Sequence, residues 1–298
     1  MLHKSHPQHS VIMNCFNGSR YLTDALESLI HQTFEDWELI FWDNQSTDIS
    51  KDILFSYKEP RFKYFYADEH TTLGPARLNA MNVASGEWFS FLDVDDIWFP
   101  DKLEAQVACI KSNPGIGLVF SRCEYFFDVE KENALTRSSS KILPIVKKLP
   151  DKNLATELFK GNFIPFPSLM IKKAALAELG PIPSYSHPPD YFFSLGIARL
   201  FPTASVDRAL CKYRLHDANL TKSIQYEGYI ESIDIVSRLS LKKDRQKNIR
   251  SNVVRFAIYL LLKRNFRQLY KNIRCISMWH FILGVCDIVR YRFRYYGF

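Results

Sequence analysis

Three carboxylates follow an apolar run in the segment FSFLDVDDIWFP, residues 89–100. Asp93, Asp95 and Asp96 come directly after aromatic residues that are typical of a buried strand. Like charges this close repel one another, and a buried carboxylate is costly unless a positive group meets it. The residues alone leave two explanations open: a site that binds a cation, or a polar strand end followed by a helix cap.

The elements that must position these carboxylates alternate along the first hundred residues. Runs of β-type residues predict strands, and apolar residues at helical spacing predict the helices between them. The short connections favour a mostly parallel sheet with helices on both faces, whose ligand crevice lies beyond the carboxyl ends of the strands. Polar clusters follow three of the expected strands, at 14–17, 43–48 and 93–96. The expected strands are 9–16, 37–42, 62–67 and 87–94. The expected helices are 19–34 and 46–57, and a loop followed by a helix is expected within 72–85.

The pattern changes after Pro100. Helices are expected at 101–113 and 191–201, strands at 117–128 and 205–216, and a strand followed by a helix within 166–180. From about residue 225 onward the whole chain has helical spacing. The sequence contains no internal repeat and no heptad array.

Composition narrows the class of protein. The chain has 298 residues, 47% of them hydrophobic, which indicates a globular protein with a full core. Its six cysteines form no CxxC pair, which argues against a zinc site or a disulfide framework. No apolar run reaches the length of a membrane span, and the N-terminus lacks the features of a signal peptide. We therefore expect a cytoplasmic protein.

Taken together, the polar clusters resemble a known family. The stretch SVIMNCFNGSRYLTDALESLIHQTFEDWELIFWDNQSTD, then Gly74, Ala76 and Arg77, then ASGEWFSFLDVDD closely resemble the family 2 glycosyltransferases of GT-A fold. The resemblance runs from about 9 to 105 and resumes at 161–170, 186–200 and 211–221. It implies an α/β fold with a Rossmann-like nucleotide-binding half and a mostly parallel central sheet.

The same resemblance suggests how the chain is divided. We expect a GT-A catalytic domain over 1–222, with a nucleotide-sugar half at 1–100 and an acceptor half at 101–222. A basic amphipathic helical extension follows at 223–298.

The family resemblance also implies an activity. It predicts a metal-dependent inverting glycosyltransferase that moves a hexose-type sugar from a UDP- or dTDP-sugar to a glycan or lipid-linked acceptor in cell-surface polysaccharide synthesis. The donor's diphosphate would bring Mn²⁺ or Mg²⁺, hard cations that prefer carboxylate oxygens. Asp93 would lie near ribose and metal, Val94 beside the donor, and Asp95 would be the main metal ligand. In an extended segment Asp93 and Asp95 share one side, which leaves Asp96 to cap the next helix.

Other donor contacts are implied by position in the family pattern. Asp43 would accept a hydrogen bond from N3–H of uracil or thymine, although DNQST also suits an Asx-turn. Phe16 and Asn17 would wall the base pocket, although Phe16 also suits a core position. Asp68 is a further contact to the base edge. Arg77 would clamp the pyrophosphate, although a solvated helix residue is the alternative.

One departure from the family pattern lies next to this arginine. Leu78 follows it where the family usually has Asn, which puts a neighbouring donor contact in doubt.

The catalytic base is expected further along the chain. Inverting transfer needs a group that takes the proton of the acceptor hydroxyl. The family places an aspartate at a helix start, which corresponds to Asp190, although Pro189 replaces the usual acidic neighbour. A helix N-cap is the alternative role for Asp190. In the later segment CKYRLHDANLT, Arg214 would neutralise the leaving diphosphate and His216 would join the metal ligands, with a structural histidine as the alternative.

The basic charge is concentrated at the C-terminus. The net charge is +7, but residues 238–298 hold fifteen Lys and Arg and two acids. An apolar stripe at 253–262 among basic and aromatic residues favours an anionic membrane surface, on the inner face of the cytoplasmic membrane. Packing on the catalytic domain or on a second subunit in a homodimer is the alternative. The basic residues could also bind the phosphates of nucleic acid without sequence specificity, but the sequence contains no specific recognition motif.

Two other functions compete with the glycosyltransferase. A sugar nucleotidyltransferase would need a Gly-rich triphosphate loop near the first strand, and NCFNGSR lacks one. A non-catalytic GT-A-like binding or scaffold protein would not need the acidic residues that the family uses, and these are present.

Overall fold

The computed structural model describes residues 7–127, 153–185, 189–216, 219, 225–265, 267–269 and 278–295. Contacts divide the chain into two compact units. The first holds Met1–Pro144, Ile164–Pro188 and Phe201–Asp217, and the second holds Ile145–Phe163, Pro189–Leu200 and Ala218–Phe298. Two segments of the expected acceptor half are thus grouped with the C-terminal helices, and the boundary that we expected at residue 222 stays a prediction.

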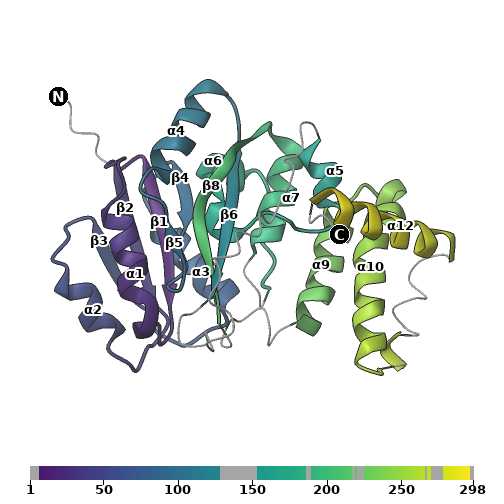
Figure 1. The fold of residues 1–298 in the computed structure, drawn as a ribbon, viewed down its shortest axis with the longest axis horizontal. Helices are drawn as coiled ribbons and strands as arrows, with labels where there is room; N and C mark the ends of the chain where they lie inside the picture. Colours follow the sequence, from purple (N-terminus) through teal and green to yellow (C-terminus); the bar gives the residue numbers. More distant parts are fainter. Residues whose placement is uncertain are drawn as a thin grey trace, which may run out of the picture. The chain divides into compact units, whose positions relative to one another are not determined.

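The first unit is built on one mostly parallel sheet, as the sequence predicted (Figure 1). Its eight strands have the order β3-β2-β1-β4-β7-β6-β8-β5. The pairs β1–β2, β1–β4, β2–β3 and β6–β8 are parallel, whereas β4–β7, β6–β7 and β5–β8 are antiparallel. The strands are β1 His9–Cys15, β2 Trp37–Asp43, β3 Phe62–Tyr66, β4 Trp88–Phe91, β5 Ile97–Trp98, β6 Leu118–Phe127, β7 Met170–Lys172 and β8 Thr203–Leu215.

The helices of this unit follow from their apolar spacing. In α1, Ser19–Ile30, the buried residues are Leu22, Ala25, Leu26 and Leu29, one stripe of a helix with 3.6 residues per turn. The prediction of a helix here is confirmed. The other helices of the unit are α2 Ser50–Ser56, α3 Leu73–Val83, α4 Lys102–Ser112, α6 Lys173–Ala177 and the single 3₁₀ turn η2 Phe166–Ser168.

The predicted start of the second helix was wrong. The helix was expected from residue 46, but α2 begins at Ser50. The residues before it form a loop held by side-chain bonds: Asp43 Oδ1 accepts from the N–H of Ser46 at 2.7 Å, and Asp48 Oδ1 accepts from the N–H of Ser50 at 3.0 Å. Ser and Asp offer the backbone these alternatives to helical hydrogen bonds.

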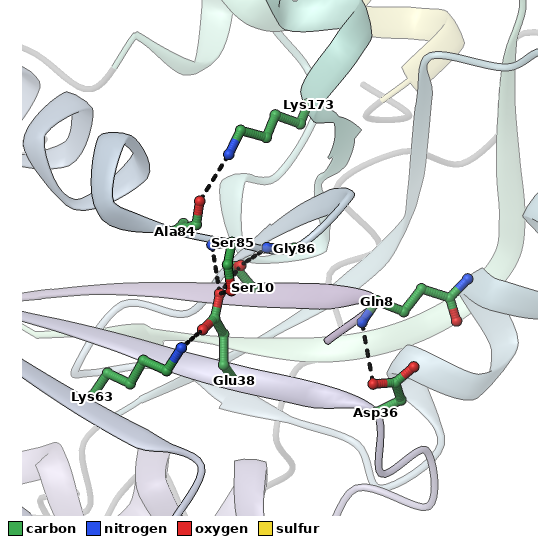
Figure 2. Close-up of polar contacts among 9 residues, drawn as sticks. All are labelled: Gln8, Ser10, Asp36, Glu38, Lys63, Ala84, Ser85, Gly86 and Lys173. Atoms are coloured by element: carbon green, nitrogen blue, oxygen red, sulfur yellow. Dashed lines mark hydrogen bonds and ion pairs between the residues drawn. The ribbon is translucent and has the colours of Figure 1, made fainter. Parts of the chain in front are cut away.

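A buried carboxylate fixes the amino ends of the first three strands. Glu38 is 2% exposed and accepts hydrogen bonds from the hydroxyl of Ser10 at 2.5 Å and from the N–H of Ser85 at 2.7 Å, and it pairs with Lys63 (Figure 2). Burial alone would raise the pKa of Glu38, but Lys63, Ser10 and Ser85 outweigh it and lower that pKa. Glu38 therefore joins β1, β2, β3 and the loop before β4 at the edge opposite the polar clusters.

The second unit is helical. Its helices are α5 Leu154–Leu158, α7 Asp190–Leu200, α9 Gln225–Leu239, α10 Arg245–Leu262 and α12 Met278–Tyr295, with a 3₁₀ turn η3 at Lys242–Asp244. α9 runs beside α10, and α12 crosses α10 (Figure 1). Gly284 allows the close crossing, because a Cβ there would lie 2.8 Å from the carbonyl oxygen of Arg250. Asp287 then accepts from Nε of Arg250 at 2.6 Å. None of the helices within the described ranges has the length and hydropathy of a membrane span.

Candidate functional site

The loops after β1 and β2 are joined to each other. Asn17 has a positive φ of 53°, which a short polar side chain tolerates, and its Oδ1 accepts from the N–H of Thr47 at 2.8 Å. Its own N–H donates to Oγ of Ser46 at 3.0 Å. Phe16 is 52% exposed, and its ring centroid lies 4.3 Å from that of His70. An exposed ring beside a fixed polar loop suits stacking against a planar ligand, and Phe16 is not the core residue that we considered as the alternative.

Asp43 ends β2 and is almost fully buried. It is 1% exposed, and its Oδ2 accepts from the hydroxyl of Tyr64 at 2.9 Å, while Oδ1 holds the N–H of Ser46. The carboxylate is thus held in one orientation, and the bond to Ser46 is the Asx-type turn that DNQST suggested. Asp68 has an exposed side chain, and its main-chain oxygen accepts from Nε2 of Gln45 at 2.9 Å.

Arg77 of α3 is buried rather than solvated. It is 1% exposed, and its guanidinium lies 4.1 Å from the ring centroid of Phe166. Nη2 donates to Oδ1 of Asp93 at 2.5 Å, and Nε donates to Oδ1 of Asn14 at 3.3 Å. This positive group answers part of the question that the acidic segment raised, because Arg77 neutralises Asp93 within the protein. Burial nevertheless raises the pKa of Asp93, against the effect of Arg77 and reinforced by Asp95.

The acidic segment itself is a turn. β4 ends at Phe91, and the N–H of Asp96 donates to the carbonyl of Asp93 at 3.1 Å. The expectation of an extended segment with alternating sides was therefore wrong. Val94 packs on the loop after β1, since a Cβ at Gly18 would lie 2.9 Å from Cγ2 of Val94.

Asp95 meets His216, which lies directly after β8. Nε2 of His216 and Oδ2 of Asp95 are 2.9 Å apart, and their side chains are 12% and 24% exposed. The ring of Tyr21 lies 5.0 Å from the imidazole. A carboxylate and an imidazole in contact are two suitable ligands for Mn²⁺, and a site completed by substrate phosphates needs few protein ligands. Over the described ranges, no group of three His, Cys, Asp or Glu side chains is placed to hold a metal ion.

Arg214 braces the acidic turn. Its Nε donates to the carbonyl of Asp95 at 2.9 Å, and its Nη2 pairs with Asp24 at 2.6 Å. The guanidinium carbon lies 4.5 Å from the ring centroid of Tyr21 and 4.5 Å from that of Phe126.

The main-chain N–H of Arg214 donates to Oδ1 of Asp96 at 3.0 Å. Asp96 therefore does not cap the next helix, which corrects our expectation: it is 1% exposed and lies beneath the turn. Burial, with Asp95 and Asp93 nearby, raises the pKa of Asp96 well above its usual range.

Asp190 belongs to the second unit. It is the first residue of α7, so the helix begins at the carboxylate itself. Nδ2 of Asn162 donates to Oδ2 of Asp190 at 2.8 Å. A partly exposed carboxylate with an oriented amide donor suits a base, provided that an acceptor hydroxyl reaches it.

A comparison with protein families decides the identity. The model of the family described as "Glycosyl transferase family 2" matches residues 10–180, more than half of the chain. The chain belongs to glycosyl transferase family 2. The match spans β1 to α6 and so includes all three polar clusters at the strand ends.

Characterised and solved proteins are similar to this family 2 glycosyltransferase. The GalNAc(5)-diNAcBac-PP-undecaprenol beta-1,3-glucosyltransferase of Campylobacter jejuni is 29% identical over 279 residues, 89% of this chain and 86% of that one. The crystal structure of Staphylococcus aureus TarS with UDP-GlcNAc has a TM-score of 0.64 at 18% identity, over 83% of this chain and 72% of that one. The mannosyltransferase PcManGT from Pyrobaculum calidifontis, in complex with GDP-Man and Mn²⁺, has a TM-score of 0.55 at 16% identity, over 97% of this chain and 88% of that one.

These similarities confirm the family, the GT-A fold and the enzyme class that the sequence predicted. The roles of the individual residues stay predictions. The structure brings Arg77 to Asp93 and His216 to Asp95, and it adds three polar contacts that the sequence analysis did not consider: Asp24, Tyr64 and Asn162. Side chains alternate between the two faces of the sheet along β3, and this alternation could have drawn attention to Tyr64.

Proposed function

We propose that this family 2 glycosyltransferase transfers a sugar, with inversion, from a UDP- or dTDP-sugar to a glycan or lipid-linked acceptor in bacterial cell-surface polysaccharide synthesis. The observation that carries the proposal is the pairing of Asp95 with His216 at the carboxyl end of β4, where a GT-A unit binds its nucleotide sugar. The similarity to the Campylobacter enzyme, whose name places its acceptor on PP-undecaprenol, supports a lipid-linked acceptor.

Within this proposal the donor lies over the loops after β1, β2 and β3. Phe16 and Asn17 wall the base, with Asp68 at its edge, and Asp43 accepts from the pyrimidine N3–H. Each oxygen of Asp43 already accepts one hydrogen bond, but a carboxylate oxygen has about two acceptor positions, so a further N–H fits. A carboxylate also accepts from N1–H of guanine, so Asp43 by itself favours uracil, thymine and guanine over adenine and cytosine.

The remaining donor contacts in the proposal belong to the diphosphate sugar. Asp93 and Val94 line the ribose, and Arg77 and Arg214 contribute positive charge close to the diphosphate. Both guanidinium groups are held by protein partners, Arg77 by Asp93 and Arg214 by Asp24. They would therefore act through a fixed field, which needs no rearrangement when the diphosphate departs.

The side chains of Asp95 and His216 are suitable ligands for a divalent ion. Asp95 and His216 would hold Mn²⁺ or Mg²⁺, with Asp93 two residues away. The bound ion would neutralise charge on the diphosphate. The Mn²⁺ bound to the similar PcManGT supports this choice of cofactor.

The protein's chemical step in this mechanism falls to Asp190. The acceptor hydroxyl attacks the anomeric carbon, and its proton passes to the Asp190 carboxylate. The bond between that carbon and the diphosphate oxygen breaks, and the electron pair leaves with the diphosphate. Attack from the opposite side inverts the configuration.

Binding of nucleotides tests the donor and the metal together. With Mn²⁺, saturating UDP or dTDP should raise the melting temperature by a few degrees, since a ligand at a hundred times its Kd adds about 2.7 kcal/mol. ADP and CDP should add little, and EDTA should abolish the response. Asp43→Asn should weaken the response to UDP, whereas Asp207→Asn, which breaks only an exposed ion pair with Arg122, should not.

Other outcomes of this experiment would count against the proposal. A larger shift with GDP would overturn the choice of base. Equal shifts in EDTA would overturn the metal, and the absence of a shift with any nucleoside diphosphate would remove the support for a donor site.

The second unit is proposed to rest on an anionic membrane. Ile258, Leu261 and Leu262 are 46%, 53% and 78% exposed, and they share one face of α10 because they are three and four residues apart. Lys263, Arg264 and Arg267 follow and are exposed. Each basic side chain near an anionic surface contributes about 1 kcal/mol. Residues 266, 270–277 and 296–298 of the proposed membrane region lie outside the described residues.

Vesicle sedimentation tests this placement. The protein should sediment with phosphatidylglycerol vesicles at low salt and not with phosphatidylcholine vesicles. Leu261→Ser/Leu262→Ser should reduce sedimentation by about tenfold, whereas Ile49→Ser, 61% exposed in the other unit, should not. In the contrary outcome, the parent protein sediments with neither kind of vesicle and forms dimers that Leu261→Ser/Leu262→Ser loses. That outcome would show that the exposed face of α10 binds a second subunit and not a membrane.

A further inference from the structure

The carboxylate at the start of α7 is held by a side chain to which the sequence analysis gave no role. Nδ2 of Asn162 donates to Oδ2 of Asp190 at 2.8 Å. Asn162 lies after α5, in a segment with no regular secondary structure. A side chain on such a segment keeps one orientation only if the backbone around it is fixed.

Helix α10 supplies part of that fixation. Nδ2 of Asn252, which is 4% exposed, donates to the carbonyl of Phe159 at 3.2 Å. Asn252 also lies close enough to the hydroxyl of Tyr191, the residue after Asp190, to lower its pKa against the larger opposing effect of burial. The hydroxyl of Tyr191 donates to the carbonyl of Leu158 at 2.6 Å. These bonds connect α10, the start of α7 and the end of α5.

A second side chain of α10 reaches the residue next to Asn162. Gly161 has a φ of +149°, and a Cβ there would overlap Nη1 of Arg255 and lie 2.8 Å from its Cζ. The guanidinium therefore lies against the backbone of Gly161. The positive φ favours glycine at this position. Asn252 and Arg255 are three residues apart on α10, so one face of this helix supports the segment from 159 to 162.

We propose that Asn162 positions the base Asp190, and that α10 fixes Asn162 through Asn252 and Arg255. This inference rests on the proposed function, because it takes Asp190 as the base. The amide donor orients one carboxylate oxygen, and thereby sets the direction of the other. It also favours the ionised carboxylate, the form that accepts a proton. The basic C-terminal helices then serve catalysis as well as any surface that they bind.

Titration of Asp190 tests the contact without a known acceptor. The carboxyl ¹³C signal of Asp190 is identified as the one missing in Asp190→Asn. In Asn162→Ala its midpoint should move up by about half a pH unit to one unit, because a donor to the charged form is lost. With a polyprenyl-diphosphate-linked sugar as the acceptor, the acidic limb of kcat should move in the same direction, with kcat about tenfold lower and the donor KM unchanged.

Matched variants separate positioning from local damage. Asn162→Ser keeps a donor and should recover much of the shift. Lys160 lies two residues before Asn162 and forms an ion pair with Glu157. Lys160→Ala removes that ion pair and should leave the midpoint unchanged. A midpoint in Asn162→Ala equal to that of the parent would overturn the inference while Asp190→Asn stays inactive. An active Asp190→Asn would instead overturn the base, and with it the proposed mechanism.

The contribution of α10 has its own control on the same helix. Asn252→Leu has a similar volume without the donor, and it should move the midpoint in the same direction as Asn162→Ala. The double variant should show less than the sum of both shifts, since the two residues act on one carboxylate. Asn248→Ala removes the bond from Nδ2 of Asn248 to Oγ of Ser240 at 3.0 Å and should leave Asp190 unaffected. Equal midpoints in Asn252→Leu and Asn248→Ala, in folded proteins by circular dichroism, would overturn the part played by α10.

Discussion

Asp190→Asn lowers kcat by about 10³-fold and leaves the response to UDP and Mn²⁺ unchanged, if Asp190 is the base. General bases contribute about 10²–10⁴-fold, because the acceptor hydroxyl is a poor nucleophile until its proton is taken. Asn has the same shape and can still bond to Asn162 and begin α7, so the fold should persist. What the variant loses is the ability to accept a proton. The donor contacts are proposed for other residues, so donor binding should not change.

The measurement is release of nucleoside diphosphate from UDP-sugars in the presence of a polyprenyl-diphosphate-linked sugar, together with the melting temperature with and without UDP. Asp234→Asn is the matched control, because Asp234 lies in the same unit and forms an exposed ion pair with Arg238 at 2.5 Å. It should retain parental kcat. An Asp190→Asn enzyme within tenfold of the parent would assign the proton to another group.

The sequence could predict the elements of this fold because their patterns are local. Leu22, Ala25, Leu26 and Leu29 are spaced for one face of a helix, and that face is buried in α1. The apolar runs that became β1 and β2 are buried along nearly their whole length, as expected of strands covered on both faces. Short connections between such elements leave few topologies, and the parallel order of the first strands follows.

The partners of the site residues could not be predicted in the same way. His216 is 121 residues from Asp95 along the chain, and Arg214 is 190 residues from Asp24. No periodicity within a strand or helix carries information over such separations. The family pattern supplied the residues themselves, but it did not indicate that Arg77 is buried against Asp93.

The C-terminal helices show a second limit. Pattern reasoning places polar side chains of an amphipathic helix on its solvent face. Asn252 is 4% exposed because it bonds to the carbonyl of Phe159, a group that needs a partner when buried. A buried polar residue is explained by its partner, and the partner here lies 93 residues earlier. The sequence therefore indicated a basic surface on these helices but not their contact with the segment that holds Asp190.

Asp95→Asn should abolish the dependence of turnover on Mn²⁺ and lower turnover by about 100-fold or more. Asn retains the shape of Asp95 and a hydrogen bond to His216, but it lacks the negative charge that holds a divalent ion. Calorimetric titration of UDP with and without Mn²⁺, alongside turnover, gives both readouts. Asp207→Asn removes an aspartate of the same unit from an exposed ion pair with Arg122 and should behave as the parent. Parental affinity for UDP and Mn²⁺ in Asp95→Asn would show that the metal, if any, is held elsewhere.

The stability of the ligand-free Asp95→Asn protein gives this experiment a second readout. Asp95 raises the pKa of both Asp93 and Asp96, because its negative charge opposes their ionisation. Loss of that charge relieves the repulsion, so the ligand-free Asp95→Asn protein should be as stable as the parent or more stable. A carboxylate retained only for structure would give the reverse, since its removal would lower stability. An acidic turn that binds a cation should therefore give two results in Asp95→Asn. The stability without ligand should be equal or higher, and the response to UDP with Mn²⁺ should be lost.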